Sequence, residues 1–334
     1  MKKKKVYYYP PGEKEGGYGN PYSANYKFAL GKYFDVFEKD NKKRIGLRSV
    51  HLLIYSFFAD IFILNWIEKI GAARYGWIQQ FLTKLSICIM RLRKKQVVWM
   101  FHNIHPHKGE QKRTKELQAF LFKKATLIIS HSTLGADYAK GKAFCPVVYS
   151  CHPVAGITID TTKSYQTPLC DVLIWGSIYS YKGIAEFLEL KEIQQSNLRV
   201  HVIGVCKEKQ LEERINNSCS SSITYENRKA DMSEIASFCK SSRYVLFPYI
   251  GDSISSSGAL IDTIVLGGNP VGPNVGAFKD TSEIGVCLTY KDTRELMEIL
   301  NSNNKIDENN REEFLKDNTW DKFAYRVYKL LDHE

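Results

Sequence analysis

The chain has 334 residues, 44% of them hydrophobic and 25% charged, with 22 glycines and 10 prolines. This composition excludes disordered and fibrous proteins, and the length suits two domains that each bury a core. The formal net charge of +11 is uneven, because residues 1–155 carry 27 Lys and Arg against 10 Asp and Glu (net +17) and the remainder carries 20 against 26 (net −6).

Short apolar runs alternate with segments of helical spacing along the whole chain. The strand-like runs are 6–9, 61–64, 97–101, 127–130, 172–175, 200–203, 223–225, 244–247 and 270–271. The segments with helical spacing are 47–58, 114–124, 183–192, 233–240 and 259–266. This alternation predicts an α/β protein with parallel sheets joined by right-handed crossovers.

A stretch rich in Thr, Ser, Pro and Gly interrupts the alternation at 152–170, which is typical of a linker. We therefore predict two doubly wound, Rossmann-like domains, 1–155 and 168–316, facing each other across a cleft. Ligands of such sheets bind beyond the carboxyl ends of the strands, so the cleft is the expected site.

Cysteine and hydropathy patterns indicate a reduced, cytoplasmic protein. The eight cysteines are dispersed and form no CxxC pair, which favours core thiols over disulfides or a zinc site. The apolar run after the four N-terminal lysines is too short for a signal peptide. The longest apolar stretch, 50–67, contains His51 and Asp60, and we interpret it as a helix followed by a buried strand.

The first candidate phosphate segment follows the strand at 172–175. That strand ends at Gly176, a short loop that begins with Ser177 follows, and Lys182 and Gly183 begin a helix. A cation there suits a phosphate, because the ammonium and the amides of a helix N-terminus attract the same anion. An ordinary surface lysine at a helix start is the alternative.

A second segment of small residues precedes the helix at 259–266. Ser255, Ser256, Ser257 and Gly258 expose backbone N–H groups and add hydroxyl donors, which suits a diphosphate. A serine N-cap explains one of these residues without any ligand.

These segments resemble the donor domain of GT-B glycosyltransferases, particularly family 4. The resemblance is carried by Gly-Ser-Ile and Lys-Gly at 176–183, Phe-Pro-Tyr at 247–249, and Ser-Gly-Ala-Leu with Gly-Asn-Pro-Val at 257–271. Residues 98–107 and 127–132 resemble strands of bacterial exopolysaccharide glycosyltransferases, and 318–324 resembles their closing helix.

The resemblance implies a GT-B fold whose C-terminal helix, 317–334, crosses back to the first domain. It also implies a hexosyltransferase-type enzyme that takes a UDP- or GDP-linked sugar. The first domain would bind the acceptor, a glycan or a polyprenyl-diphosphate-linked molecule, in polysaccharide or exopolysaccharide biosynthesis.

Two departures from family 4 support a second possibility. The family carries Arg where this chain has Ser177, and two acidic residues where it has Ser255 and Thr263, with Asp262 adjacent to the second. A catalytically inactive protein that binds sugar nucleotides is therefore an alternative.

Sugar transfer requires a stabilised leaving diphosphate, a positioned acceptor hydroxyl and a group that takes its proton. The Lys182 ammonium and the amides around Ser255–Gly258 supply the first, so we expect no cofactor and no metal requirement. A loop containing Gly17 and Gly19 can approach the donor closely, although an ordinary turn explains it equally well.

Three histidines follow the strand at 97–101. We predict His102 and His107 as catalytic residues on the acceptor side, because imidazoles near neutral pKa exchange protons or bind hydroxyls. A metal site is disfavoured, because Pro106 intervenes and acidic or Cys partners are missing. Glu68 and Asp60 are weaker candidates for the base.

The positive first half has three interpretations. An apolar stripe on 77–92 ends in the basic run 91–95, and for the stripe itself we favour a helix packed on the sheet with a solvated end. The clustered charge of this half nevertheless predicts peripheral contact with an anionic membrane, at the inner face of the cell membrane. A nucleic-acid-binding protein is the rival, but no binding motif supports it, and we expect no nucleic-acid partner.

Overall fold

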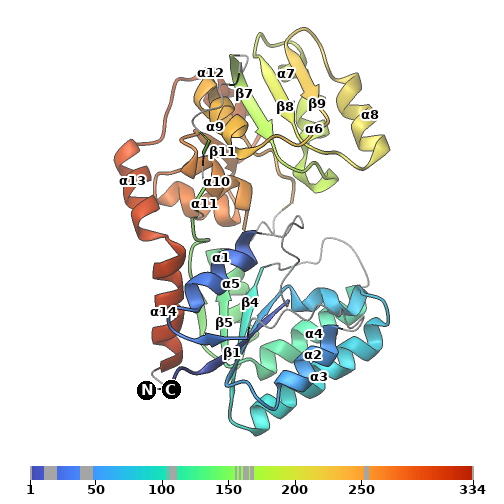
Figure 1. The fold of residues 1–334 in the computed structure, drawn as a ribbon. Helices are drawn as coiled ribbons and strands as arrows, with labels where there is room; N and C mark the ends of the chain where they lie inside the picture. The colour runs from blue at the N-terminus through green and yellow to red at the C-terminus, as the bar shows by residue number, and fades with distance from the viewer. Residues whose placement is uncertain are drawn as a thin grey trace. The chain divides into compact units, whose positions relative to one another are not determined.

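The computed structural model describes residues 2–10, 21–37, 48–102, 104, 111–154, 156–157, 159–160, 165, 169–251 and 256–332. The chain forms two compact units, Met1–Pro153 together with Thr319–Glu334, and Val154–Asn318. In each unit a parallel sheet lies between helices (Figure 1). The α/β class with two doubly wound sheets is thereby confirmed.

The sheet of the first unit has the strand order β2-β1-β3-β4-β5-β6, and all its described pairs are parallel. Its strands are β1 (Lys5–Tyr9), β2 (Asp35–Val36), β3 (Ile61–Asn65), β4 (Gln96–Phe101), β5 (Leu127–Ser130) and β6 (Val147–Tyr149). The chain proceeds from β1 to one edge and then returns to build the rest from β3. The switch point of this sheet therefore lies between β1 and β3.

Helices cover both faces of the first sheet. They are α1 (Pro21–Leu30), α2 (Arg48–Tyr55), α3 (Gly76–Leu92), α4 (Gln111–Lys124), α5 (Thr133–Lys140), α14 (Trp320–Asp332) and the 3-10 helix η1 (Ile67–Ala72). The C-terminal helix α14 lies beside α1 in Figure 1 and buries Trp320, Phe323, Val327 and Leu331 against strand residues of this sheet. Residues 320–332 thus complete the core of the first unit.

The sheet of the second unit has the order β12-β11-β10-β7-β8-β9, again with parallel pairs throughout the described strands. Its strands are β7 (Cys170–Trp175), β8 (Val200–Ile203), β9 (Ile223–Glu226), β10 (Ser242–Leu246), β11 (Pro270–Pro273) and β12 (Leu288–Tyr290). The chain builds β7 to β9 in one direction and β10 to β12 in the other, so β7 and β10 flank the switch point.

The helices of the second unit follow the crossovers of its sheet. They are η2 (Ser180–Lys182), α6 (Ile184–Leu188), α7 (Lys191–Gln194), α8 (Lys209–Asn217), α9 (Met232–Ser241), α10 (Gly258–Val265), α11 (Gly276–Glu283), α12 (Thr293–Asn301) and α13 (Glu308–Asp317). Side-chain caps define several starts; for example, the Ser257 hydroxyl accepts a hydrogen bond from the Leu260 N–H.

Sequence periodicity missed the short strands β2, β6 and β12, which have two or three residues each. The single helix predicted over 183–192 is two short helices, α6 and α7, with Glu189 and Leu190 between them. In each case the run was too short for periodicity to identify the element.

The interpretation of the stripe on 77–92 as a core-packing face is wrong. In α3 the residues buried against the rest of the unit are mainly small or polar, among them Gln79, Gln80, Thr83 and Ser86. Trp77 and Phe81 are instead 64% and 63% exposed. Periodicity located the helix and its apolar face correctly, but that face points away from the core.

Within the described part of the chain no helix is both long and apolar enough to span a bilayer. All eight cysteines are free thiols, and five of them are buried: Cys151, Cys170, Cys206, Cys239 and Cys287.

Candidate functional site

The candidate donor site of the second unit lies at the switch point between β7 and β10. The loop after β7 carries Gly176 and leads to Lys182, and the loop after β10 carries Tyr249. Because β7 and β10 are parallel neighbours, both loops leave the sheet at the same edge. At a switch point the adjacent loops diverge to opposite faces and leave a crevice, where open α/β sheets bind ligands.

Lys182 carries a buried cation at this edge. Lys182 is only 8% exposed, and burial lowers the pKa of its ammonium to about 8. Among the described residues no acidic side chain forms an ion pair with it; its Nζ lies over the Tyr249 ring, 5.5 Å from the centroid. A buried ammonium without a counter-charge is costly, so this arrangement suits a site that receives an anion.

Gly183 brings the two loops into contact. Its backbone is left-handed (φ 64°), and a Cβ at this position would lie 2.1 Å from the carbonyl oxygen of Pro248. The Ile250 N–H also donates to the Tyr181 carbonyl oxygen at 3.1 Å. The Lys182 loop is therefore fixed against the segment that follows β10.

Tyr249 connects the lysine to the serine-rich turn. Its ring lies beside the Lys182 ammonium, and its hydroxyl lies 3.4 Å from the Ser257 Oγ. Ser257 caps α10, whose first amides have no helical acceptor. The ammonium and the N-cap residue of α10 thus both lie beside the same tyrosine.

The other predicted donor residues lie around this point. Gly176 has a left-handed φ of 100°, and a Cβ there would lie 3.7 Å from the Lys182 Nζ. Ser177 and Gly258 are exposed, and Ser256 is half-buried. Ser255 lies outside the described residues.

Thr263 of α10 is the residue that the sequence comparison with family 4 placed at the second acidic position, and Asp262 is adjacent to it. Thr263 is buried and accepts a hydrogen bond from the Trp175 indole N–H at 2.9 Å, which joins α10 to the end of β7. The neighbouring Asp262 is half-buried, and this burial raises the pKa of its carboxyl to about 6. Asp262 is therefore the acidic side chain that α10 offers.

In the first unit, His102 follows β4 and is only 4% exposed. Its Nε2 lies 3.1 Å from Oδ1 of Asn65, the last residue of β3, and its ring stacks on Trp66 with centroids 4.6 Å apart. These contacts fix the imidazole at the carboxyl edge of the first sheet. Trp66 has a left-handed backbone (φ 47°), which a non-glycine residue seldom adopts.

Sequence reasoning missed a second histidine at this edge. His131 follows β5, and its Nδ1 lies 2.7 Å from the Ser150 carbonyl oxygen, so Nδ1 carries the proton. Its Nε2 then accepts a hydrogen bond from the Tyr22 hydroxyl at 2.6 Å. Burial is the main cause that lowers the pKa of His131 to about 3, and the nearby His152 contributes.

His152 lies near the same group, with its ring centroid 5.3 Å from that of His131. Burial lowers the pKa of His152 to about 4. His131 and His152 are therefore neutral at physiological pH and serve as hydrogen-bonding parts of a buried aromatic cluster around Tyr22.

The remaining candidates are His107, Gly17, Gly19, Glu68 and Asp60. His107, Gly17 and Gly19 lie outside the described residues. Glu68 is 3% exposed in η1. Asp60 precedes β3 at the opposite edge of the sheet from His102, where it accepts hydrogen bonds from the Lys5 N–H and the Lys95 ammonium, at 2.9 and 2.7 Å.

No group of three or more His, Cys, Asp or Glu side chains that could hold a metal ion occurs among the residues that the structure describes. The expectation that the chemistry requires no metal stays a prediction.

No protein-family model and no curated protein sequence matches the chain. Several solved structures, in contrast, match its fold. HepE of Anabaena in complex with UDP is 13% identical with a TM-score of 0.63, over 99% of this chain and 100% of that one. The trehalose-6-phosphate protein from E. coli bound with UDP-2-fluoro glucose is 9% identical with a TM-score of 0.67, over 99% of each chain.

A UDP-forming α,α-trehalose-phosphate synthase from Burkholderia vietnamiensis is 10% identical with a TM-score of 0.64, over the full length of both chains. At these identities the likeness concerns the fold. The two doubly wound units of this chain are those of a GT-B fold.

Proposed function

We propose that the protein is a glycosyltransferase that takes a sugar from a UDP- or GDP-linked donor. The observation that carries the proposal is the buried Lys182 ammonium, which lacks an acidic partner among the described residues and lies at the switch point of the second sheet. The neighbouring structures that bind UDP, or UDP-2-fluoro glucose, support a nucleotide sugar as the ligand.

The proposed role of Lys182 is to stabilise the diphosphate as it leaves. As the bond from the anomeric carbon to the phosphate oxygen breaks, negative charge grows on the diphosphate. A fixed ammonium and the amides at the start of α10 stabilise that charge without reorganisation. In this proposal no metal ion is needed, because the protein supplies the positive charge.

We assign acceptor binding to the first unit. The proposed acceptor is a glycan or a polyprenyl-diphosphate-linked molecule of polysaccharide or exopolysaccharide biosynthesis. We propose His102 as the residue that binds the acceptor hydroxyl or takes its proton. His107 is the second candidate for this role. A lipid-linked acceptor places the enzyme in the cytoplasm, peripheral to the inner face of the cell membrane.

The replacement Lys182→Ala tests the proposal. UDP or GDP should raise the melting temperature of the parent protein, and the matching nucleotide sugar should slowly release its nucleoside diphosphate. Lys182→Ala should abolish both effects, because it removes the cation that binds the diphosphate. Differential scanning fluorimetry and a coupled assay for the released diphosphate measure them.

Lys207→Ala is the matched control, since Lys207 is an exposed lysine of the same unit. It should behave as the parent. A melting shift that survives in Lys182→Ala would remove Lys182 from the site. A shift without any donor turnover would favour the inactive sugar-nucleotide-binding protein, and salt-sensitive duplex binding without a shift would favour the nucleic-acid-binding protein.

A further inference from the structure

Helix α3 presents an apolar stripe to the outside of the first unit. Trp77, Phe81, Leu85 and Leu92 are 64%, 63%, 39% and 83% exposed. At 100° per residue they fall within an arc of about 80°. The buried residues of the helix occupy the opposite side, so α3 is inverted relative to an amphipathic helix that packs on a core.

Local hydrogen bonds satisfy part of the polar inner face, whereas the buried Gln79 Oε1 and Thr83 Oγ1 have no hydrogen-bond partner among the described residues. The Gln79 and Gln80 side-chain amides donate to the backbone carbonyls of Arg74 and Arg113, at 2.8 and 3.2 Å. The Ser86 hydroxyl donates to the Leu82 carbonyl at 2.6 Å. The small polar face lets α3 pack closely beside α2 and α4. The outward stripe is therefore not needed to hold the unit together.

The sequence around the stripe is positively charged. Residues 69–95 contain no acidic residue, and their basic residues are Lys69, Arg74, Lys84, Arg91, Arg93, Lys94 and Lys95. The neighbouring α4 exposes further lysines, and Lys84 lies over the ring of its Phe120, 5.8 Å from the centroid. The segment that carries the stripe thus has charge of one sign, and α4 adds its exposed lysines together with the exposed Glu116.

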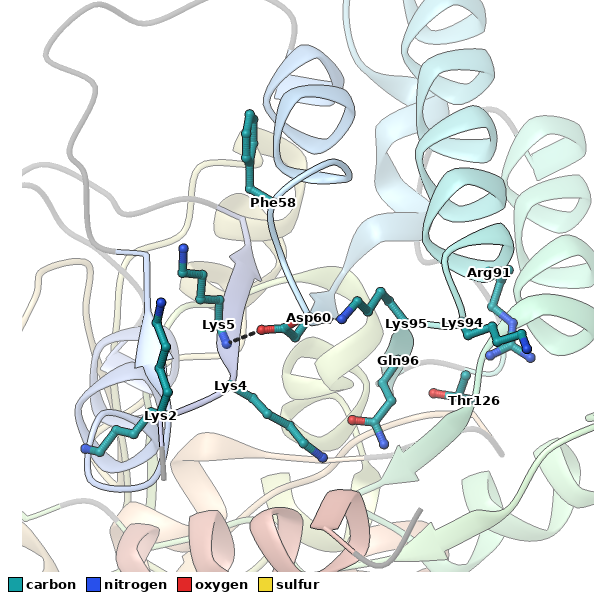
Figure 2. Close-up of a pocket in the computed structure, with 11 residues that line it drawn as sticks. Lys2, Lys4, Lys5, Phe58, Asp60, Arg91, Lys94, Lys95, Gln96 and Thr126 are labelled. Carbon is teal, nitrogen blue, oxygen red and sulfur yellow. Dashed lines mark hydrogen bonds and ion pairs between the residues drawn. The ribbon is translucent and has the colours of Figure 1, made fainter.

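A basic cavity of about 650 Å³ continues this surface at the amino-terminal edge of the first sheet (Figure 2). Lys2–Lys5, Arg91, Lys94 and Lys95 line it. Asp60, the one acidic side chain among the described residues that line it, already binds Lys95 at 2.7 Å and the Lys5 N–H at 2.9 Å. Excess positive charge remains, which suits the phosphates of anionic lipids.

The stripe and the cavity meet at the C-terminal end of α3. Arg91 lines the cavity, and Leu92, the most exposed residue of the stripe, follows it. Phe58, which follows α2 and is 61% exposed, lines the same cavity (Figure 2). Exposed apolar and cationic side chains are therefore next to each other at the C-terminal end of α3.

We infer that this surface, the α3 stripe with the basic cavity, docks the protein on an anionic lipid bilayer. The inference rests on the proposed function for the lipid-linked acceptor and adds the surface that reaches the lipid. Exposed Trp, Phe and Leu enter the interface between head groups and acyl chains, while Lys and Arg attract the lipid phosphates.

Charge and polarity argue against the other partners. A nucleic acid would use the cations but would leave the apolar stripe in water. A second copy of this chain would set the same basic cluster opposite itself, which is unfavourable. A bilayer of anionic lipids uses both features.

The test measures binding of the full chain to vesicles by flotation. The parent should bind phosphatidylcholine vesicles containing about 30% phosphatidylglycerol, and bind pure phosphatidylcholine at least about tenfold more weakly. The double replacement Trp77→Ser/Phe81→Ser and the double replacement Arg91→Glu/Lys94→Glu should each weaken binding at least about tenfold.

Matched controls use equally exposed residues elsewhere. Phe28→Ser/Phe144→Ser replaces two aromatic side chains that are 76% and 80% exposed, and Lys207→Glu/Lys240→Glu reverses two charges of the second unit. Both controls should bind like the parent. Circular dichroism and the UDP-induced melting shift of every variant report folding and the donor site separately.

Equal vesicle binding by the parent and the stripe variants would overturn the inference, as would failure of the parent to bind the anionic vesicles. Dimerisation that the stripe variants abolish, seen by analytical ultracentrifugation without lipid, would assign the surface to a second copy instead. If vesicle binding followed the expected pattern but no nucleotide shift occurred, the docking surface would stand and the proposed function would fall.

Discussion

At the scale of single residues, Lys182 couples the proposed donor site to pH. Burial disfavours the charged form of its side chain and lowers the pKa of the ammonium to about 8. Between pH 8 and the ordinary lysine value the unfolded chain binds more protons at this position than the folded chain. Folding stability from this group therefore rises with pH in that window, whereas its ability to bind an anion falls.

We expect UDP, or GDP where that is the ligand, to bind more weakly as the pH rises from 7 to 9.5. The charged ammonium binds the diphosphate, and the fraction of charged Lys182 falls above pH 8. The midpoint should lie above 8, because bound diphosphate favours the charged form. Isothermal titration calorimetry across this range measures the dissociation constant.

Lys182→Arg is the matched variant, because a guanidinium stays charged throughout the range. Its affinity should change little with pH. A parallel decline in the parent and in Lys182→Arg would assign the pH dependence to another group.

The sequence singled out Lys182 and Ser257 as candidates, because a cation and a cap residue stand at recognisable positions before helices. It did not reveal that Tyr249 joins them, since that contact depends on the pairing of β7 with β10. His131 was accessible to the same reasoning as His102, because each directly follows a strand-like run. His152 was not, because β6 is too short to detect.

At the scale of elements, the join between η2 and α6 depends on Gly183. We expect Gly183→Ala to lower the free energy of unfolding by about 2–3 kcal/mol, because alanine disfavours the left-handed backbone and its Cβ would meet the Pro248 carbonyl. The displaced loop should also weaken nucleotide binding. Urea denaturation and calorimetry measure the two effects.

Gly258→Ala is the matched replacement, since a Cβ there has no neighbour within 4 Å. It should leave stability nearly unchanged, within about 0.5 kcal/mol. Equal losses from the two replacements would show that the contact with Pro248 does not constrain the loop.

Helix α3 shows why periodicity alone cannot orient an element. The apolar stripe was visible in the sequence. The rule that apolar faces are buried then predicted that the stripe faces the core, whereas it faces outward. The inner face consists mainly of Gln, Thr and Ser side chains, together with Ile87 and Met90, and several of the polar side chains bond to nearby backbone carbonyls. That solution depends on the neighbouring α2, η1 and α4, and a single-helix pattern carries no information about them.

At the scale of the whole molecule, two phenylalanines nine positions apart in sequence belong to different units. Phe314 in α13 is buried in the second unit, and Phe323 in α14 is buried in the first. We expect Phe323→Ala to destabilise the first unit and Phe314→Ala the second, each by about 3–5 kcal/mol. Hydrogen exchange with mass spectrometry should show faster exchange confined to the strands of the affected unit.

Each variant is the control for the other. Loss of protection in the same strands for both replacements would mean that the two units unfold as one.

The chain leaves the first unit at Pro153 and returns to it at Thr319. During synthesis on the ribosome, the second unit therefore has its whole sequence before the first receives Trp320, Phe323, Val327 and Leu331. Domains generally fold in the order in which they are synthesised. Here, however, the core of the first unit stays incomplete until the second unit has been synthesised. The nascent first unit thus exposes an apolar face until the segment 320–332 has emerged from the ribosome and packed onto it.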